Sequence, residues 1–154
     1  MSVKRALISG AVFLIGAALV YFATGLSNAG GVVLKPNDAS VVSHGAEVYE
    51  QNCASCHGSN LEGEEGWQGL DEDGRLRAPP HDATGHTWHH DGELLFRLTK
   101  YGPAEVIGDP SYATNMPAYE GILSDDEIIA VLSYIKSTWP PHIRARHDEM
   151  EERR

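Results

Sequence analysis

The sequence has 154 residues, of which 42% are hydrophobic and 22% are charged, and its formal net charge at pH 7 is −10. This length allows one domain with short extensions, and the composition excludes a disordered, collagen-like or disulfide-dense chain. Residues 30–139 contain 6 Lys or Arg and 18 Asp or Glu, so no nucleic-acid partner is expected, because nucleic-acid binding depends on basic side chains that neutralise phosphates.

The amino-terminal segment is predicted to meet a membrane. Residues 6–26 are a run of 21 uncharged residues, and a helix that rises ~1.5 Å per residue would carry them across the ~30 Å hydrocarbon core of a bilayer. Lys4 and Arg5 precede the run, so the positive-inside rule places the amino terminus in the cytoplasm. We therefore expect residues 1–29 to be a single-pass anchor in a bacterial inner membrane that also contacts lipid.

A cleaved signal peptide is the alternative for the same segment. Ser27 and Ala29 before Gly30 offer small residues at the cleavage spacing. Signal-peptide apolar regions usually run only ~7–15 residues, and this longer run favours the anchor. In both cases the chain is exported, with residues 30–40 as a linker: a periplasmic domain on a membrane anchor, or a soluble periplasmic protein.

The first predicted helix of the exported part covers residues 41–52, where Val42, Ala46 and Tyr49 recur on one face. Residues 58–80 are rich in Gly, Glu, Asp and Pro and show no sustained period, which is typical of a surface loop. A loop of this length needs a reason to be ordered, and a bound cofactor would supply one.

The two segments flank the most informative motif of the chain. The only two cysteines, Cys53 and Cys56, are separated by two residues and followed at once by His57. This C-x-x-C-H spacing is typical of c-type haem attachment, in which two thioethers fasten the haem and the imidazole ligates the iron. A thioredoxin-like pair would need a βαβ setting, a zinc site would need two more ligands, for which His89 and His90 are available, and a bare disulfide leaves the histidine unexplained. We therefore predict one covalently bound haem c.

Two further helices and a tail follow. Asp91 is a suitable N-cap for a helix over residues 92–101, which ends before a glycine and a proline. Ser124 and the glutamate three residues later form a capping box that starts a helix ending at Trp139. The tail, residues 140–154, carries mixed charges and almost nothing apolar, so we expect a solvated helical extension or a disordered segment.

Met116 is the predicted sixth ligand of the iron. It is the only methionine between the two later helices, and Pro117 stiffens the loop that holds it. Histidine is the competing ligand type, although each candidate is more simply a surface group or a group on the propionate side of the haem. The high density of histidines in this region has no explanation from the sequence; they are His81, His86, His89 and His90.

With these motifs in place, residues 41–139 resemble the class I, monohaem cytochromes c. In that family the first helix carries a glycine eight residues before the first haem cysteine and an aromatic residue four positions later, which here are Gly45 and Tyr49. The last helix packs on this pair through residues matched by Val131 and Tyr134. The resemblance implies an all-α cytochrome c fold, with about three core helices around one haem.

The resemblance also implies roles for loop residues. A proline carbonyl in the family accepts the Nδ1 proton of the haem histidine, and Pro79 is the best match, with Pro80 next to it. Trp88 is a weaker match to the aromatic residue that reaches a haem propionate. His81 departs from the pattern, because it stands where the family has an apolar residue over the haem edge.

As a function, the resemblance implies electron transfer rather than enzymatic catalysis. We expect a single-electron carrier of a membrane respiratory or periplasmic chain, with His57 and Met116 as axial ligands. Its partners would be a quinol-oxidising complex, a terminal oxidase or a dehydrogenase. A permanent haem subunit of a larger membrane oxidoreductase is the first alternative, and a gas sensor or peroxidase with an open sixth site is the second.

Overall fold

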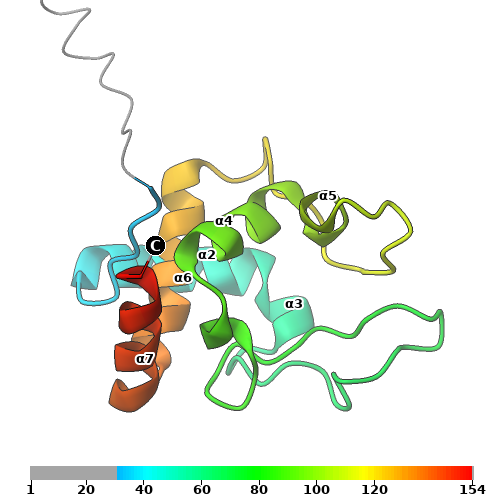
Figure 1. The fold of residues 1–154 in the computed structure, drawn as a ribbon, viewed down its shortest axis with the longest axis horizontal. Coiled ribbons are helices and arrows are strands. Elements are labelled where there is room, and N and C mark those ends of the chain that lie inside the picture. Colours follow the sequence, from blue (N-terminus) through cyan, green and yellow to red (C-terminus); the bar gives the residue numbers. More distant parts are fainter. Residues whose placement is uncertain (1–30, 154) are drawn as a thin grey trace, which may run out of the picture. The chain divides into compact units, whose positions relative to one another are not determined.

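The computed structural model describes residues 31–153 of the chain (Figure 1). Within this part the chain is helical and contains no β-strand, only isolated bridges. The predicted all-α class is therefore confirmed for the described residues. The elements are α2 (Ala39–Asn52), α3 (Ala54–His57), the 3₁₀ turn η1 (Thr87–His89), α4 (Gly92–Tyr101), α5 (Pro103–Ile107), α6 (Asp125–Thr138) and α7 (Pro141–Glu151).

The predicted membrane segment, residues 6–26, lies outside the described residues. Among the helices of residues 31–153, none combines the length and the apolar character that crossing a bilayer requires.

The core is organised by the crossing of α2 and α6, as the resemblance implies. A Cβ atom on Gly45 would overlap the carbonyl oxygen of Ala130, so only glycine lets the two helices approach this closely. Tyr49 is 1% exposed, and its ring lies 5.5 Å from that of Tyr134, tilted by 55°. Val131 beside the crossing is 2% exposed. The crossing therefore fixes the end of α2 from which the C-x-x-C-H motif continues.

Helix ends follow local capping chemistry. The Asp91 side chain accepts the amide of Leu94 at 2.8 Å at the start of α4, and Gly102 ends this helix with φ 82°. The capping box of Ser124 and Glu127 is present at the start of α6. Helix α2 begins two residues earlier than predicted, because the Asp38 carboxylate caps the amides of the first turn.

The tail is helical, which is one of the two forms expected for it, but it is not fully solvated. Residues 141–151 form α7, and two of its side chains, Ile143 and His147, are buried rather than solvated. His147 is 0% exposed, lies 5.2 Å from the Trp139 ring and accepts a hydrogen bond at Nδ1 from the buried Lys136 ammonium at 3.0 Å. The low apolar content of the tail gave no sign of this packing, because a neutral histidine and the alkyl stem of a lysine fill the interface instead of apolar side chains.

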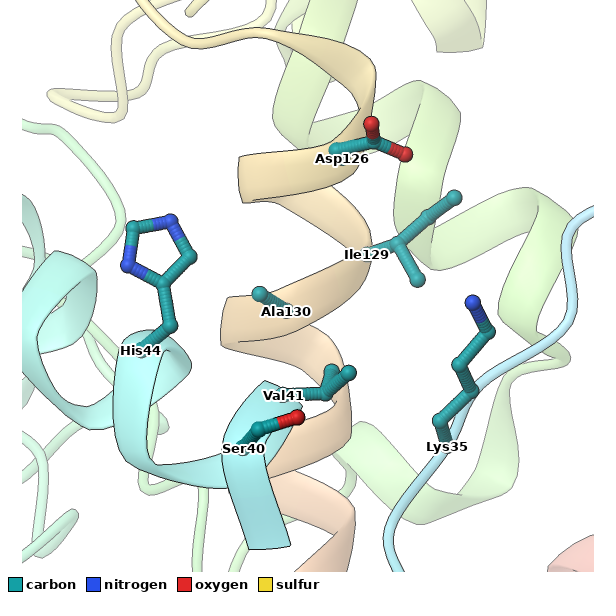
Figure 2. A pocket seen from close by; sticks show the side chains of 7 residues that line it. All are labelled: Lys35, Ser40, Val41, His44, Asp126, Ile129 and Ala130. Carbon is teal, nitrogen blue, oxygen red and sulfur yellow. The ribbon is translucent and has the colours of Figure 1, made fainter. Parts of the chain in front are cut away.

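A pocket of about 290 Å³ lies between the first half of α2 and the start of α6 (Figure 2). Val41, Ile129 and Ala130 supply apolar lining, and Lys35 and Asp126 lie at its edges. None of the C-x-x-C-H residues lines it. This pocket is therefore separate from the site described next.

Candidate cofactor site

The C-x-x-C-H motif is folded as one helical turn. Cys53 ends α2 and begins α3, and its carbonyl oxygen accepts the amides of Cys56 at 3.1 Å and His57 at 2.9 Å. Both thiols are free: Cys53 is half-buried and Cys56 is exposed. The bare disulfide, one of the three alternatives for the motif, therefore gains no support from the structure. Residues three apart on a helical turn present their side chains on the same side, as two thioethers to one planar group require.

His57 is buried and held by a proline carbonyl. Its side chain is 8% exposed in total, and Nδ1 donates a hydrogen bond to the carbonyl oxygen of Pro79 at 2.8 Å. Burial lowers the pKa of His57, although the bond to Pro79 opposes the shift. The ring is therefore neutral at pH 7, with Nε2 as its unprotonated nitrogen. A neutral imidazole with one nitrogen fixed by a carbonyl is the form in which histidine ligates metals.

His81 lies against the ring of His57. The two centroids are 4.0 Å apart and the rings are inclined by only 21°. Nδ1 of His81 is hydrogen-bonded to Thr87 Oγ1 at 2.8 Å, and its carbonyl accepts Nε1 of Trp139 at 2.8 Å. Burial holds the pKa of His81 well below its ordinary value, so the ring is neutral and packs as a flat, largely apolar group. This explains how a histidine can occupy a position where the family has an apolar residue.

The stacking also bears on one competing ligand. With the ring centroids of His57 and His81 only 4.0 Å apart, no metal ion fits between the two rings in this arrangement.

The long loop after the motif is held by its own backbone contacts. The amide of Gly63 donates to the carbonyl of His57 at 2.8 Å, and the amide of His81 donates to the carbonyl of Leu61 at 2.8 Å. Gly63 has φ 70°, and a Cβ there would press on the backbone of Pro79 and Pro80. The loop is thus folded back on the motif, with Gly63 against the backbone of Pro79 and Pro80.

Met116 lies in a loop between α5 and α6. It is half-buried, and its amide donates to Thr114 Oγ1 at 3.0 Å. Before it, the carbonyl of Ala113 accepts the amide of Leu76 at 3.0 Å. After it, the amide of Tyr119 donates to the carbonyl of Thr99 in α4 at 3.1 Å. The methionine is therefore held between two anchored points, one on the long loop and one on α4.

Trp88 carries a polar atom without a partner. Its Nε1 is buried and makes no hydrogen bond to any described residue. The indole stacks on His89 with centroids 3.7 Å apart, and the Arg146 guanidinium from α7 lies 5.2 Å from the ring centre. An unpaired buried donor costs free energy, and an acceptor bound beside the indole would remove that cost. A carboxylate such as a haem propionate has the required chemistry.

The remaining histidines form ring contacts rather than a metal centre. His86 stacks on Trp67 with centroids 5.3 Å apart and meets His90 edge-on at 5.4 Å. Burial lowers the pKa of both histidines. Within residues 31–153, no three His, Cys, Asp or Glu side chains gather as metal ligands would, so the zinc alternative gains no support.

The structure brings some predicted site residues together and leaves others apart. His57 and Pro79 are in contact, whereas no hydrogen bond or ring contact among the described residues joins Met116 or Trp88 to His57. Sequence reasoning missed the aromatic contact of Trp67 and the cation above Trp88. Neither has a signal in residue spacing, because both contacts join distant segments.

Comparisons with known proteins match this chain to one family and to subunits of two oxidases. The family described as "Cytochrome c" matches residues 42–139. The chain is 25% identical over 96 residues to the Cbb3-type cytochrome c oxidase subunit FixP of Sinorhizobium medicae, a match that covers 62% of this chain and 29% of that one. It is 28% identical over 93 residues to the Cbb3-type cytochrome c oxidase subunit CcoP of Cereibacter sphaeroides, covering 59% and 28%. The match thus spans less than a third of the length of these relatives. No solved structure matches.

Proposed function

Because this chain belongs to the cytochrome c family, we propose that it carries one covalent haem c with His57 and Met116 as axial ligands and works as a single-electron carrier. The observation that supports this most is the single helical turn that presents Cys53, Cys56 and His57 together, with Pro79 occupying Nδ1 of the histidine. That arrangement leaves Nε2 of His57 as the nitrogen that would ligate the iron.

The residues of the chain fit the group that the family binds. Cys53 and Cys56 would form the two thioethers, and the buried Nε1 of Trp88 would donate to a propionate. When bound, the haem supplies an iron that cycles between the ferric and ferrous states. Pro79 orients the imidazole of His57 and raises its basicity through the Nδ1 hydrogen bond. A Met116 thioether favours the ferrous state relative to a second histidine, and so raises the reduction potential.

This function needs no substrate at the iron, so the chain acts as an electron-transfer protein rather than an enzyme. Acid-acetone extraction tests the attachment: the haem should stay with the protein, at one haem per chain in the pyridine haemochrome assay. Haem that comes out into the solvent would overturn the covalent assignment, and a second haem per chain would overturn the count.

The relatives favour an oxidase as the destination of the electrons. Two of them are named as subunits of cbb3-type cytochrome c oxidases. We propose that this chain either delivers electrons to a membrane terminal oxidase or is itself a permanent haem subunit of such a complex. Copurification from gently solubilised membranes separates the two, since a subunit keeps stoichiometric partners and a mobile carrier is lost on washing.

The proposed location is the periplasmic side of a bacterial inner membrane, with residues 6–26 as the single-pass anchor that also contacts lipid. It rests on the uncharged run and the basic residues before it. Membrane fractionation with a carbonate wash should leave the protein in the pellet. Recovery in the soluble periplasmic fraction, with a mature chain starting near Gly30, would favour the signal peptide instead.

An open sixth site would favour the gas-sensor or peroxidase alternative. Ferrous protein exposed to carbon monoxide should show no spectral change if Met116 is bound firmly. Rapid binding of carbon monoxide would mean that the site is open.

A further inference from the structure

Residues 62–77, called the acidic hairpin below, form a distinct surface feature of the long loop. Leu70 and Leu76 pair across an antiparallel bridge. The turn between them is closed by the Asp71 amide, which donates to the carbonyl of Arg75 at 2.8 Å, and by the Gly74 amide, which donates to the carbonyl of Asp71 at 3.1 Å. Side chains opposite each other in such a bridge lie side by side. The hairpin therefore presents two neighbouring leucines, which are 55% and 36% exposed.

The hairpin is strongly acidic, with six carboxylates and two arginines. Some of its carboxylates serve the fold: Glu64 accepts the amide of Ala78, and Asp71 accepts from Asn115 Nδ2 at 3.0 Å. The exposed side chains of Glu65, Glu72 and Asp73 make no hydrogen bond or ion pair with any residue the structure describes. These three charges face water beside the leucines and are not used in contacts that hold the hairpin together.

The position of the hairpin links it to the proposed haem ligands. At its start, the amide of Gly63 bonds the carbonyl of His57. On its other arm, the amide of Leu76 donates a hydrogen bond to the carbonyl of Ala113. Leu76 also forms a parallel β-bridge with Thr114, two residues before Met116. In Figure 1 the two loops extend on the same side of the helices. The acidic hairpin thus joins the loop of the proposed methionine ligand to the turn of the proposed histidine ligand.

The cross-link is reinforced by side chains. Arg75 donates to Asn115 Oδ1 at 2.7 Å, and Asn115 in turn donates to Asp71. The hairpin is therefore tied to the Met116 loop at several points.

Charge decides which partner this surface can meet. A second copy of a chain with net charge −10, an anionic lipid surface and a nucleic acid would all be repelled by Glu65, Glu72 and Asp73. Adjacent exposed apolar side chains rimmed by charge are typical of a protein interaction site. The occupant that remains is a protein face with an apolar centre and a rim of Lys or Arg.

We propose that the acidic hairpin is the docking surface through which this chain exchanges electrons with a basic partner protein. The proposal rests on the proposed function, since it assumes a haem between His57 and Met116. Glu65, Glu72 and Asp73 attract the partner, and Leu70 and Leu76 form the dry contact that brings the two redox centres together.

The charge part is tested with a small cationic reductant. Hexaammineruthenium(II) gives one electron to the ferric protein and becomes ruthenium(III), and stopped-flow absorbance follows the reaction. The variant E65K/E72K/D73K should react about tenfold more slowly than wild type at low ionic strength. The control E47K/E149K/E152K makes the same change of net charge at exposed positions of α2 and the tail, and should slow the reaction by less than about threefold.

The difference between these two variants should vanish near 1 M salt, where the screening length falls to ~3 Å. Equal slowing by both variants would overturn the proposal, because then only the net charge matters. An unchanged reduction potential and far-red absorption band in each variant show that the hairpin still folds around the same iron site.

The apolar part is tested with membranes of the organism that makes the chain. Leu70→Ser should lower the rate of oxidation by these membranes severalfold while the rate with hexaammineruthenium(II) stays the same. Ile122→Ser is the control, since Ile122 is 64% exposed but lies outside the hairpin. Equal rates for the two variants would overturn docking at the hairpin. Failure of the wild-type protein to bind haem or to react with any reductant would instead overturn the proposed function, so the two failures are distinguishable.

Discussion

His57 and Met116 reach the proposed iron site from regions that are built in different ways. His57 follows α2 by one helical turn, and that helix is fixed by the crossing at Gly45 and by a buried tyrosine. Met116 lies in a loop whose position depends on hydrogen bonds to another loop and to the end of α4. The histidine side is therefore rigid because helices carry it, whereas the methionine side is held only by a few loop contacts.

The largest effect should come from removing the attachment itself. Replacing both Cys53 and Cys56 by serine leaves no sulfur to form a thioether, so covalent haem should be lost completely. Haem staining after denaturing electrophoresis and the mass of the intact chain measure this. Retained covalent haem in the double variant would mean that another side chain makes the bond.

Gly45→Ala should disturb the crossing of α2 and α6, which holds the histidine side in place. The added methyl group would overlap the carbonyl of Ala130, which is backbone and has no alternative rotamer. We expect a loss of about 3 kcal/mol in the free energy of unfolding, the upper part of the range for overpacking. Denaturant titration measures it, with Ala46→Ser on the same helix as a control. A loss below about 1 kcal/mol would show that α2 and α6 can move apart cheaply.

Met116→Ala removes the proposed methionine ligand and should leave the covalent attachment of the haem intact. The weak far-red sulfur-to-iron band should disappear, and the reduction potential should fall by on the order of 0.1 V, since axial ligands set potentials over a range of ~0.8 V. Single alanine variants should each retain the band when made at His81, His86, His89 and His90. A band that persists in Met116→Ala would identify a different ligand.

The stability of α7, which carries Arg146 against the Trp88 ring, should depend on pH. Burial first, and the nearby Lys136 ammonium second, lower the pKa of His147 in the folded state, with Glu151 and Asp148 opposing the shift. Above the unfolded-state pKa of about 6.5 both states are neutral and α7 is fully stabilised. As pH falls below that value, the unfolded chain takes up a proton that the folded chain resists, so stability decreases.

This decrease is specific to His147 if the variant His147→Gln lacks it. Between pH 7.5 and 5.5 the wild-type protein should lose about 1 kcal/mol more of its unfolding free energy than the variant. Denaturant titrations at the two pH values measure the difference. Parallel losses in the two proteins would assign the pH dependence to other groups, such as His81 or His90, whose pKa values are also lowered.

Asn115→Ala should give the smallest effect and tests how the Met116 loop is held. The amide joins Arg75 at 2.7 Å and Asp71 at 3.0 Å on the acidic hairpin. Losing these exposed bonds should cost about 1 kcal/mol and lower the temperature at which the far-red band disappears. Ser111→Ala, in the same loop but bonded only to Asp109, is the matched control. Identical melting of the band in both variants would mean that the hairpin does not support the methionine.

Several features could be predicted because they depend on residues close together in sequence. The capping box at Ser124 and the cap at Asp91 use bonds that span three residues, and both are present. The motif from Cys53 to His57 likewise indicates its chemistry within five consecutive positions. The crossing at Gly45 was predictable only through a family resemblance, since nothing local says which helix passes over the glycine.

The attachment motif and the caps of α4 and α6 could thus be predicted from the sequence, because caps and covalent spacing are local properties, whereas the all-α class came from the family resemblance. The contact of Pro79 with His57, 22 positions away, was predictable only from the resemblance, and the stacking of His81 on the same ring emerged only in the tertiary structure. The tertiary structure also decided that the charged tail buries His147 against Trp139. Burial and the choice of contact partner depend on which distant segments come together, and a residue's own neighbours in the chain do not specify this.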